Sequence, residues 1–293
     1  MPEISFKDRT VVITGAGRGL GRSYALEIGR RGGNVVINDL GGATDGSKAA
    51  ADQVVDEVKA AGGNAVAEYS NIATPEGGAA VIKAAVDTFG RVDAVINNAG
   101  ILRDASLVKI TDEQFDAVLN VHLRGSFYVT RAAFPIMKTQ GYGRFVFTTS
   151  AAGLFGNFGQ SNYAAAKMGL VGISNVVGIE GAKSNILSNV IAPGAKTRMT
   201  EGMGAILDLL PPESVAPLVA YLVSDACSVT QHIYSAGGGR YARVFVGVAP
   251  GWYPETGNIA SIDDIAANIG AINSTEDYII ARNITEEAVL LKH

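Results

Sequence analysis

The chain has 293 residues, 47% of them apolar and 18% charged, so it is large enough to bury one core without disulfides or metal ions. Its net charge is −4 and its Lys and Arg residues are not clustered, which argues against nucleic acid or an anionic membrane as a partner. The single cysteine, Cys227, excludes an intrachain disulfide and favours a reducing, cytoplasmic setting. Without a signal-peptide pattern or an apolar run of membrane-spanning length, we expect a soluble protein.

Short apolar runs alternate with longer amphipathic stretches along most of the chain. The runs are continuously apolar, which predicts strands covered on both faces and therefore a parallel sheet. They span Thr10–Thr14, Val35–Asn38, Ala65–Tyr69, Ala94–Asn97, Phe145–Ser150 and Leu187–Ile191. Helices are predicted at Ala49–Ala61 and Ala79–Phe89, where glycines end the helical pattern. We therefore predict an α/β fold, a doubly wound parallel sheet with helices on both faces.

The sequence pattern changes near Gly239. Beyond it, Val244–Val248 is predicted as a strand, Pro250–Gly257 as a loop and Ser261–Asn273 as a capped helix. This segment is too short for a domain of its own. We therefore divide the chain into one main domain, residues 1–240, and a carboxy-terminal appendage, residues 241–293.

A glycine-rich turn directly follows the first predicted strand. Its glycines fit the pattern T-G-x-x-x-G-x-G, although the stricter fingerprint G-x-G-x-x-G is not met. Such glycines let the backbone approach a pyrophosphate, whose charge then faces the free amides and positive dipole end of the next helix. The alternative is a turn that only lets strand and helix pack closely. The surrounding strand and helix favour a dinucleotide cofactor, with contacts from Gly15, Gly17, Arg18, Gly19 and Leu20.

Asp39 ends the second predicted strand, about twenty residues after the glycine turn. A carboxylate at this place accepts hydrogen bonds from the adenosine ribose hydroxyls of NAD and repels the 2′-phosphate of NADP. Asp39 therefore favours NAD, while Arg18 keeps NADP open because a guanidinium in the turn can pair with that phosphate. The alternative for Asp39 is a turn residue ahead of Gly41 and Gly42.

Tyr163 and Lys167 are spaced so that both side chains project from one face of a helix. A free phenol has a pKa of about 10, so a tyrosine acts as a general acid or base near neutrality only beside a cation that favours the phenolate. Lys167 is such a cation. Ser150 lies at the end of a predicted strand, and its hydroxyl can bind the substrate oxygen. Alone, a Tyr and Lys at this spacing would be an ordinary surface pair, so Ser150 strengthens the prediction.

These residues resemble the short-chain dehydrogenases/reductases over about the first 240 residues. The matching segments follow the order of that family at similar spacings. They are the glycine turn, Asn97–Gly100, Asn120, Ser150, Tyr163, Lys167 and Pro193–Gly194. The resemblance implies a Rossmann-type domain that binds NAD or NADP. It also implies further groove-lining residues, namely Asn71, Ile72, Asn97, Ala99, Gly100, Pro193, Gly194 and Thr197.

The resemblance assigns a role to each residue of the catalytic set. Tyr163 is expected to be the acid/base, and Ser150 to orient the carbonyl oxygen. Lys167 is expected to lower the pKa of Tyr163 and to bind the nicotinamide ribose, and Asn120 to hold a water linked to Lys167. Asn71 stands where many members carry an Asp that binds adenine, and its amide oxygen can still accept that bond.

Other residues with ligand or acid/base chemistry carry no site prediction. His122 lies close to Asn120 in the sequence, and a lone His there is expected to be packed or solvated and not catalytic. No cluster of His, Cys or carboxylates has ligand spacing, so no metal is predicted.

Within the family, residues 38–42, 99–104, 156–160 and 215–218 are similar to the dehydrogenase unit of peroxisomal multifunctional enzyme type two, a (3R)-hydroxyacyl-CoA dehydrogenase. This resemblance implies NAD-dependent interconversion of (3R)-3-hydroxyacyl-CoA and 3-oxoacyl-CoA. It also implies a homodimer or homotetramer packed through the helix that carries Tyr163 and those before it. The apolar stretch Met199–Leu210 predicts either a lid over a long substrate or an ordinary buried helix.

Other functions stay open at this point. A hydroxysteroid or another secondary alcohol as substrate, or 3-oxoacyl reduction with NADPH, would use the same mechanism. An alternative of another class is a protein that senses NAD(H) without turnover. The complete set of Asn120, Ser150, Tyr163 and Lys167 argues against a sensor, because simple binding needs no activated phenol.

Overall fold

The computed structural model describes residues 3–41, 49–196, 210–255 and 258–291. In these residues eight strands form one sheet in the order β3-β2-β1-β4-β5-β6-β7-β8, and the neighbours from β3 to β7 are parallel. The strands are β1 (Thr10–Thr14), β2 (Asn34–Asn38), β3 (Asn64–Glu68), β4 (Ala94–Asn97), β5 (Gly143–Thr148), β6 (Ile186–Pro193), β7 (Ile233–Gly237) and β8 (Arg240–Val244). The predicted doubly wound α/β fold is confirmed.

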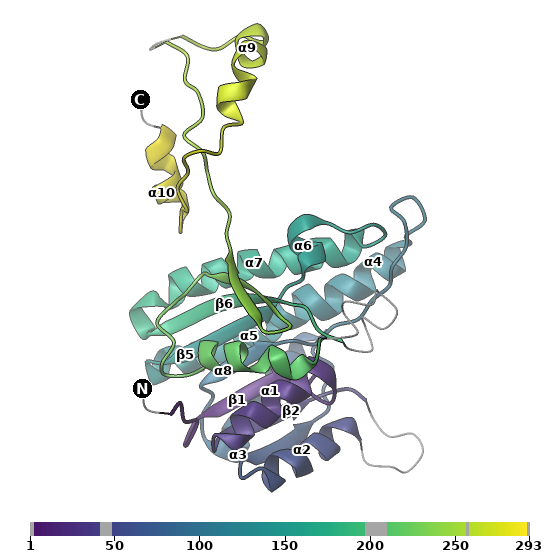
Figure 1. The fold of residues 1–293 in the computed structure, drawn as a ribbon. Coiled ribbons are helices and arrows are strands. Elements are labelled where there is room, and N and C mark those ends of the chain that lie inside the picture. The colour runs from purple at the N-terminus through teal and green to yellow at the C-terminus, as the bar shows by residue number, and fades with distance from the viewer. Residues whose placement is uncertain (1–2, 42–48, 197–209, 256–257, 292–293) are drawn as a thin grey trace. The chain divides into compact units, whose positions relative to one another are not determined.

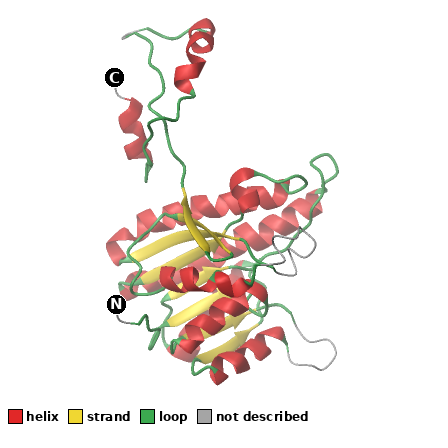
Figure 2. Cartoon of the chain, in the orientation of Figure 1, coloured by secondary structure: helices red, strands yellow, loops and turns green. Residues whose placement is uncertain are grey.

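Helices cover both faces of this sheet (Figures 1 and 2). Helices α1, α2 and α8 share one core with the sheet, formed around Tyr24, Val54 and Val219, while α3, α5 and α7 pack on the other face. The helices are α1 (Gly19–Arg30), α2 (Ala50–Ala60), α3 (Pro75–Phe89), α4 (Asp112–Leu119), π-helical η1 (Asn120–Gly125), α5 (Ser126–Gln140), α6 (Ala151–Phe155), α7 (Ser161–Gly181), α8 (Ala216–Leu222), α9 (Ile262–Ile272), α10 (Ile284–Ala288) and the short 3₁₀ turns η2 (Ala182–Ser184), η4 (Pro212–Ser214) and η5 (Val289–Leu291).

The order of the sheet reverses at β1. This strand pairs with β2 on one side, where Val12 lies opposite Val36, and with β4 on the other side, where Val12 lies opposite Val95. All three valines are completely buried, as expected for strands covered on both faces. In an open parallel sheet, a crevice forms at the carboxyl ends of the strands where the order reverses. The glycine turn that follows β1 therefore lies at this crevice.

The strands at the far edge of the sheet differ from the prediction. The predicted strand Val244–Val248 is wrong in its bounds, because β8 ends at Val244 and Val248 forms only an isolated bridge to Ile279. Gly238 and Gly239 have φ angles of 58° and 82°, and this left-handed turn returns the chain alongside β7. The predicted helix beyond it is confirmed as α9, which Ser261 caps in a reciprocal capping box.

The chain divides into two compact units, Met1–Arg243 and Val244–His293. The first unit contains β1 to β7, β8 up to Arg243, and the crevice. The second contains α9, α10 and η5, and α9 has no buried residue. Each unit is considered by itself below, and the candidate site belongs to the first.

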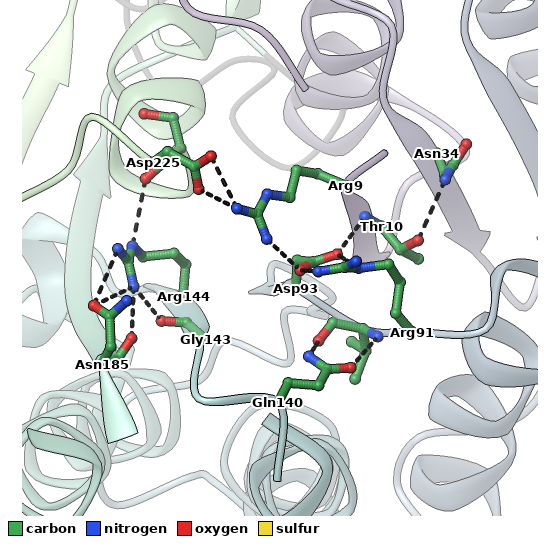
Figure 3. Close-up of polar contacts among 12 residues, drawn as sticks. Arg9, Thr10, Asn34, Arg91, Asp93, Gln140, Gly143, Arg144, Asn185 and Asp225 are labelled. Carbon is green, nitrogen blue, oxygen red and sulfur yellow. Dashed lines mark hydrogen bonds and ion pairs between the residues drawn. The ribbon is translucent and has the colours of Figure 1, made fainter. Parts of the chain in front are cut away.

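An ionic network lies at the amino ends of β1, β4 and β5, away from the crevice (Figure 3). The Asp93 carboxylate, directly before β4, accepts hydrogen bonds from the guanidinium groups of Arg9 and Arg91 and from the backbone N–H of Thr10. Arg144 in β5 donates to the backbone oxygen of Asn185 at 2.8 Å. This network connects neighbouring strands at their amino ends, and the candidate site lies at their carboxyl ends.

Candidate active site

A groove of about 580 Å³ opens at the carboxyl ends of β1, β2, β4 and β5. Its volume lies in the range of pockets that hold small molecules and cofactors. Most of the predicted site residues line it, namely Gly15, Arg18, Gly19, Leu20, Asp39, Asn71, Ile72, Ala99, Gly100, Ser150, Tyr163, Lys167 and Pro193. Residues that are distant in the sequence are thus brought together at one crevice.

Four predicted site residues do not line the groove, and one falls outside the described residues. The four that do not line it are Gly17, Asn97, Asn120 and Gly194. Thr197 and most of the predicted lid, Met199–Leu210, lie outside the described part of the chain. The predictions for those residues therefore stay predictions.

The glycine turn after β1 has a shape that only glycine allows. Gly15 and Gly19 adopt positive φ angles of 63° and 53°. A Cβ atom on Gly15 would lie 2.7 Å from the Cα of Ala99, and one on Gly21 would lie 2.5 Å from the carbonyl oxygen of Gly15. Gly15 and the start of α1, with Gly19 and Leu20, border the groove. These features fit the diphosphate of a dinucleotide.

Asp39 both organises the turn after β2 and lines the groove. Its Oδ2 accepts a hydrogen bond from the backbone N–H of Gly17 at 3.0 Å, and its Oδ1 accepts one from Gly41 at 2.9 Å. Gly17 thus acts behind the groove wall by fixing this carboxylate. Each carboxylate oxygen keeps further acceptor capacity, which suits the two hydroxyls of an adenosine ribose. The two alternatives for Asp39, turn residue and groove residue, are compatible with each other.

The wall after β4 is held by Asn98 and not by Asn97. The Asn98 amide donates to the backbone oxygens of Thr14 and Gly15, both at 3.0 Å, and Asn98 lines the groove. Asn97, the last residue of β4, points into the core and donates to Thr130. Neighbouring residues of a strand face opposite sides, and the sequence alone does not show which of two adjacent asparagines faces the turn.

Ser150, Tyr163 and Lys167 meet at the end of β5. Ser150 caps α6 and is hydrogen-bonded through its side chain to Tyr163. Tyr163 and Lys167 lie one turn apart on α7, and the Lys167 Nζ is 5.4 Å from the centroid of the Tyr163 ring. The Lys167 Nζ also donates to the backbone oxygen of Thr148 at 2.6 Å. The predicted association of these three side chains is thus present in the structure.

Burial determines the protonation of both groups on α7. Burial raises the pKa of Tyr163 and outweighs the opposing hydrogen bond from Ser150, while the negative charge of Asp104 raises it further. Burial also lowers the pKa of Lys167 to about 7, because the ammonium loses its hydration. The expected lowering of the Tyr163 pKa is therefore not what the structure gives.

Asn120 lies next in the chain to the groove-lining residues Val121 and His122. It begins the π-helix η1, and its Oδ1 accepts a hydrogen bond from Arg124 at 2.8 Å. Its side chain does not line the groove. The predicted water beside Lys167 stays a prediction. Gly194 also lies just outside the lining, where its N–H donates to Ala236 in β7.

Several groove-lining residues are not among the predicted ones, and His122 is the most informative of them. Its ring is buried and lies edge-on to Tyr163, which agrees with the expectation of a packed histidine.

The predicted absence of a metal stays a prediction. Within the described ranges, no group of three or more His, Cys, Asp or Glu is placed to hold a metal ion. The helices described also include none with the length and apolar character needed to span a bilayer.

Comparison with known proteins identifies the class. Residues 9–205 match the short chain dehydrogenase family, so the chain belongs to this family and is an oxidoreductase that acts on alcohol or keto groups with NAD or NADP. A short-chain type dehydrogenase/reductase of Mycobacterium tuberculosis is 53% identical over 243 residues, which cover 81% of this chain and 85% of that protein.

Two further similarities extend the comparison. Peroxisomal multifunctional enzyme type 2 of Drosophila melanogaster is 52% identical over 242 residues, which cover 80% of this chain but only 40% of that longer protein. The crystal structure of a short chain dehydrogenase from Mycobacterium avium has a TM-score of 0.81 at 40% identity, and the match covers 92% of this chain and 97% of that one. The similarity in sequence and the similarity in fold thus agree on the family.

Proposed function

We propose that this enzyme interconverts (3R)-3-hydroxyacyl-CoA and 3-oxoacyl-CoA with NAD, and that Tyr163 is the general acid/base. The observation that carries the proposal is the hydrogen-bonded pair of Ser150 and Tyr163, which lies in the same groove as the glycine turn and Asp39. The similarity of four segments to a (3R)-hydroxyacyl-CoA dehydrogenase unit supports the acyl-CoA substrate.

The glycine turn and the residues around it would hold the cofactor. Gly15 and Gly19 would present backbone amides to the diphosphate, and Asp39 would accept hydrogen bonds from the adenosine ribose. When bound, NAD supplies the acceptor for the hydride that leaves the alcohol carbon, and NADH supplies the donor in the reverse direction. Asp39 supports NAD as the cofactor, since its carboxylate would repel a 2′-phosphate.

The protein's own residues would handle the proton. Ser150 and Tyr163 would bind the substrate oxygen through their two hydroxyls and fix its position. During oxidation the Tyr163 oxygen takes the proton of the substrate hydroxyl, and during reduction it returns a proton to the carbonyl oxygen. Lys167, when charged, stabilises the phenolate that accepts the proton during oxidation and that forms again during reduction, because an opposite charge close by favours the ionised form.

The substrate is tested with a panel of 3-hydroxyacyl-CoA chain lengths and hydroxysteroids, each assayed with NAD and NADP by the absorbance of the reduced nicotinamide. We expect turnover of (3R)-3-hydroxyacyl-CoA with a preference for NAD. A clear preference for a hydroxysteroid, or for NADPH-dependent reduction, would replace the proposed substrate or cofactor by the corresponding alternative. Cofactor binding without turnover of any alcohol would leave a sensor.

The role of Tyr163 is tested by Tyr163→Phe. Removing the acid/base should lower kcat by about 10²–10⁴-fold, while the affinity for NAD, measured by calorimetry, stays within about twofold. Tyr221→Phe is the matched control, because Tyr221 lies on α8 and does not line the groove. We expect wild-type kinetics from it. Unchanged turnover in Tyr163→Phe would remove Tyr163 from the mechanism.

We also propose that two copies of the chain associate through α5 and α7. An apolar strip on these helices is lined by Phe127, Phe134, Ile173, Val176 and Val177, with Arg131 and Glu180 on the same strip. Phe127 and Val176 are 43% and 52% exposed, which is high for large apolar side chains. The strip carries both a cation and an anion. A second copy related by a two-fold axis could therefore pair Arg131 with Glu180 of the partner subunit.

A further inference from the structure

His122 is a buried histidine for which the proposed mechanism has no role. It lies in the π-helix η1, between α4 and α5, and its ring is 1% exposed although it borders the groove. The ring contacts two parts of the site that come from distant segments of the chain. One is the wall after β4, and the other is Tyr163 on α7.

The contact with the wall is a hydrogen bond and a close packing contact. The Nε2 atom lies 3.0 Å from the backbone nitrogen of Ile101 and 2.8 Å from its oxygen, so it bonds to one of them according to the tautomer. A Cβ atom on Gly100 would lie 2.1 Å from the His122 Cε1. The ring therefore supports the wall directly behind Gly100 and Ile101, both of which line the groove.

The contact with Tyr163 is edge-to-face. The ring centroids of His122 and Tyr163 are 5.2 Å apart and the ring planes are at 89°. This geometry is the favourable one for two aromatic rings, and it restricts how the tyrosine ring can tilt. The orientation of the Tyr163 hydroxyl toward Ser150 thus depends in part on His122.

The electrostatic environment keeps the His122 ring uncharged. Burial, together with the positive charge of Lys167, lowers the pKa of His122 to about 3. Charged groups of the same π-helix and of the loop after β4 have partners of their own: Arg124 donates to Asn120, Asp104 accepts from Gln160, and Arg103 donates to a backbone oxygen. The His122 Nδ1 has no hydrogen-bond partner in the described part of the chain. The ring is thus held by its Nε2 and by packing, and it is not set up to exchange protons.

We propose that His122 is a positioning residue of the active site. Its ring fixes the tilt of Tyr163, and its bond to Ile101 fixes the cofactor wall, so that one side chain sets the distance between the two. This inference rests on the proposed acid/base role of Tyr163, but it does not depend on which alcohol is the substrate. A phenylalanine would fill the space of the ring without the unpartnered Nδ1, but it could not make the bond to the backbone of Ile101.

Two substitutions separate the two contacts. His122→Phe keeps an aromatic ring beside Tyr163 and loses the Ile101 bond, so the KM for NAD should rise by about tenfold with kcat within about twofold. His122→Gln keeps a polar group for Ile101 and loses the ring. It should lower kcat by about tenfold or more and shift the pKa seen in the pH dependence of kcat, because small misplacements of a catalytic group are costly. His232→Gln is the control, since His232 bonds to Tyr234 outside the groove.

The measurements use the full chain and whichever alcohol the wild-type enzyme oxidises. If both variants keep the wild-type kcat, KM and pH profile per folded molecule and only melt at a lower temperature, His122 is a packing residue and the proposal fails. A wild-type enzyme inactive toward hydroxyacyl-CoA but active on another alcohol overturns the proposed substrate only. If the variants do not fold, ¹⁵N NMR of the wild-type histidines decides. A His122 ring that gains a proton between pH 5 and 8 overturns the proposal, because a charged ring would not stay buried between Ile101 and Tyr163.

Discussion

At the scale of single residues, Lys167 shows how a site can oppose stability. The lysine is 3% exposed, and its ammonium has the Thr148 carbonyl as a hydrogen-bond acceptor. Burying it lowers its pKa to about 7, far below the ordinary value of a lysine. The buried ammonium therefore raises the free energy of the folded state, because in the unfolded chain water would solvate it fully. The same burial leaves Lys167 close to half-protonated near neutrality, where small changes in its surroundings alter its charge.

This cost predicts how Lys167→Met changes stability with pH. Between pH 7 and 10 the unfolded chain holds a proton on Lys167 that the folded protein has lost, so wild-type stability rises with pH over this window. Below pH 7 the penalty is complete. The substitution should therefore stabilise the protein most below pH 7, and its advantage should shrink by up to about 1.4 kcal/mol per pH unit from pH 7 to 10.

Urea unfolding of both proteins across this pH range measures the effect at one protein concentration. Lys183→Met, at a lysine in the η2 turn, is the control and should give a difference that does not vary in this way. A difference for Lys167→Met that is constant from pH 6 to 10 would show that Lys167 is not desolvated in the folded protein. Turnover should fall in either case, because Lys167 faces Tyr163.

The sequence alone was sufficient for residues whose chemistry is local. Asp39, Ser150, Tyr163 and Lys167 were predicted from their types and spacing, and all four line one groove. That Asn98 and His122 line the groove was not predicted, for a geometric reason. Which asparagine faces the glycine turn depends on the pleat of β4, and the direction of His122 depends on the wider turn of a π-helix. The raised pKa of Tyr163 was missed because burial is a property of the whole fold.

At the scale of helices and strands, the continuously apolar runs predicted β1 to β6 well. Such strands are specified by their own composition, since both faces are covered by helices. The β7–β8 hairpin was missed, because its strands are short and half-exposed and its glycines look like the end of a domain. Gly238 and Gly239 instead form the turn that joins the two strands. The two glycines of the turn can be recognised in the sequence, but the short strands on either side of it cannot.

The apolar strip on α5 and α7 predicts the effect of Val176→Glu. A charge in the middle of an apolar contact between two copies would be buried without a partner, so the substitution should lower the mass in sedimentation equilibrium toward that of a monomer. Val108→Glu is the control, because Val108 is 90% exposed in a loop away from the strip. A wild-type monomer, or an unchanged mass in Val176→Glu, would contradict the proposed association.

At the scale of the whole first unit, the carboxyl ends and the amino ends of the strands differ in function. Below, the carboxyl edge and the amino edge of the sheet denote these two sets of strand ends. The carboxyl edge carries the groove, where glycines leave space and a lysine is buried at a cost. The amino edge carries the network around Asp93, whose side chain is 2% exposed between two arginines (Figure 3). Its contacts tie β1 and β4, the same two strands that border the crevice. The amino edge thus stabilises the strands whose other ends form the site.

This arrangement predicts that Asp93→Asn lowers stability without changing catalysis. The substitution keeps the shape of the side chain but removes the charge and turns an amide N–H₂ toward groups that donate hydrogen bonds. Removing one partner of a buried ion pair costs about 3–5 kcal/mol, and we expect about 3 kcal/mol because the arginines are partly exposed. Asp87→Asn, at an exposed pair with Lys83, should change the free energy of unfolding by less than about 0.5 kcal/mol. Urea unfolding gives both values, and the kcat and KM of Asp93→Asn should stay within about twofold of wild type. A large change in KM would instead show that the two edges are coupled through β1 and β4.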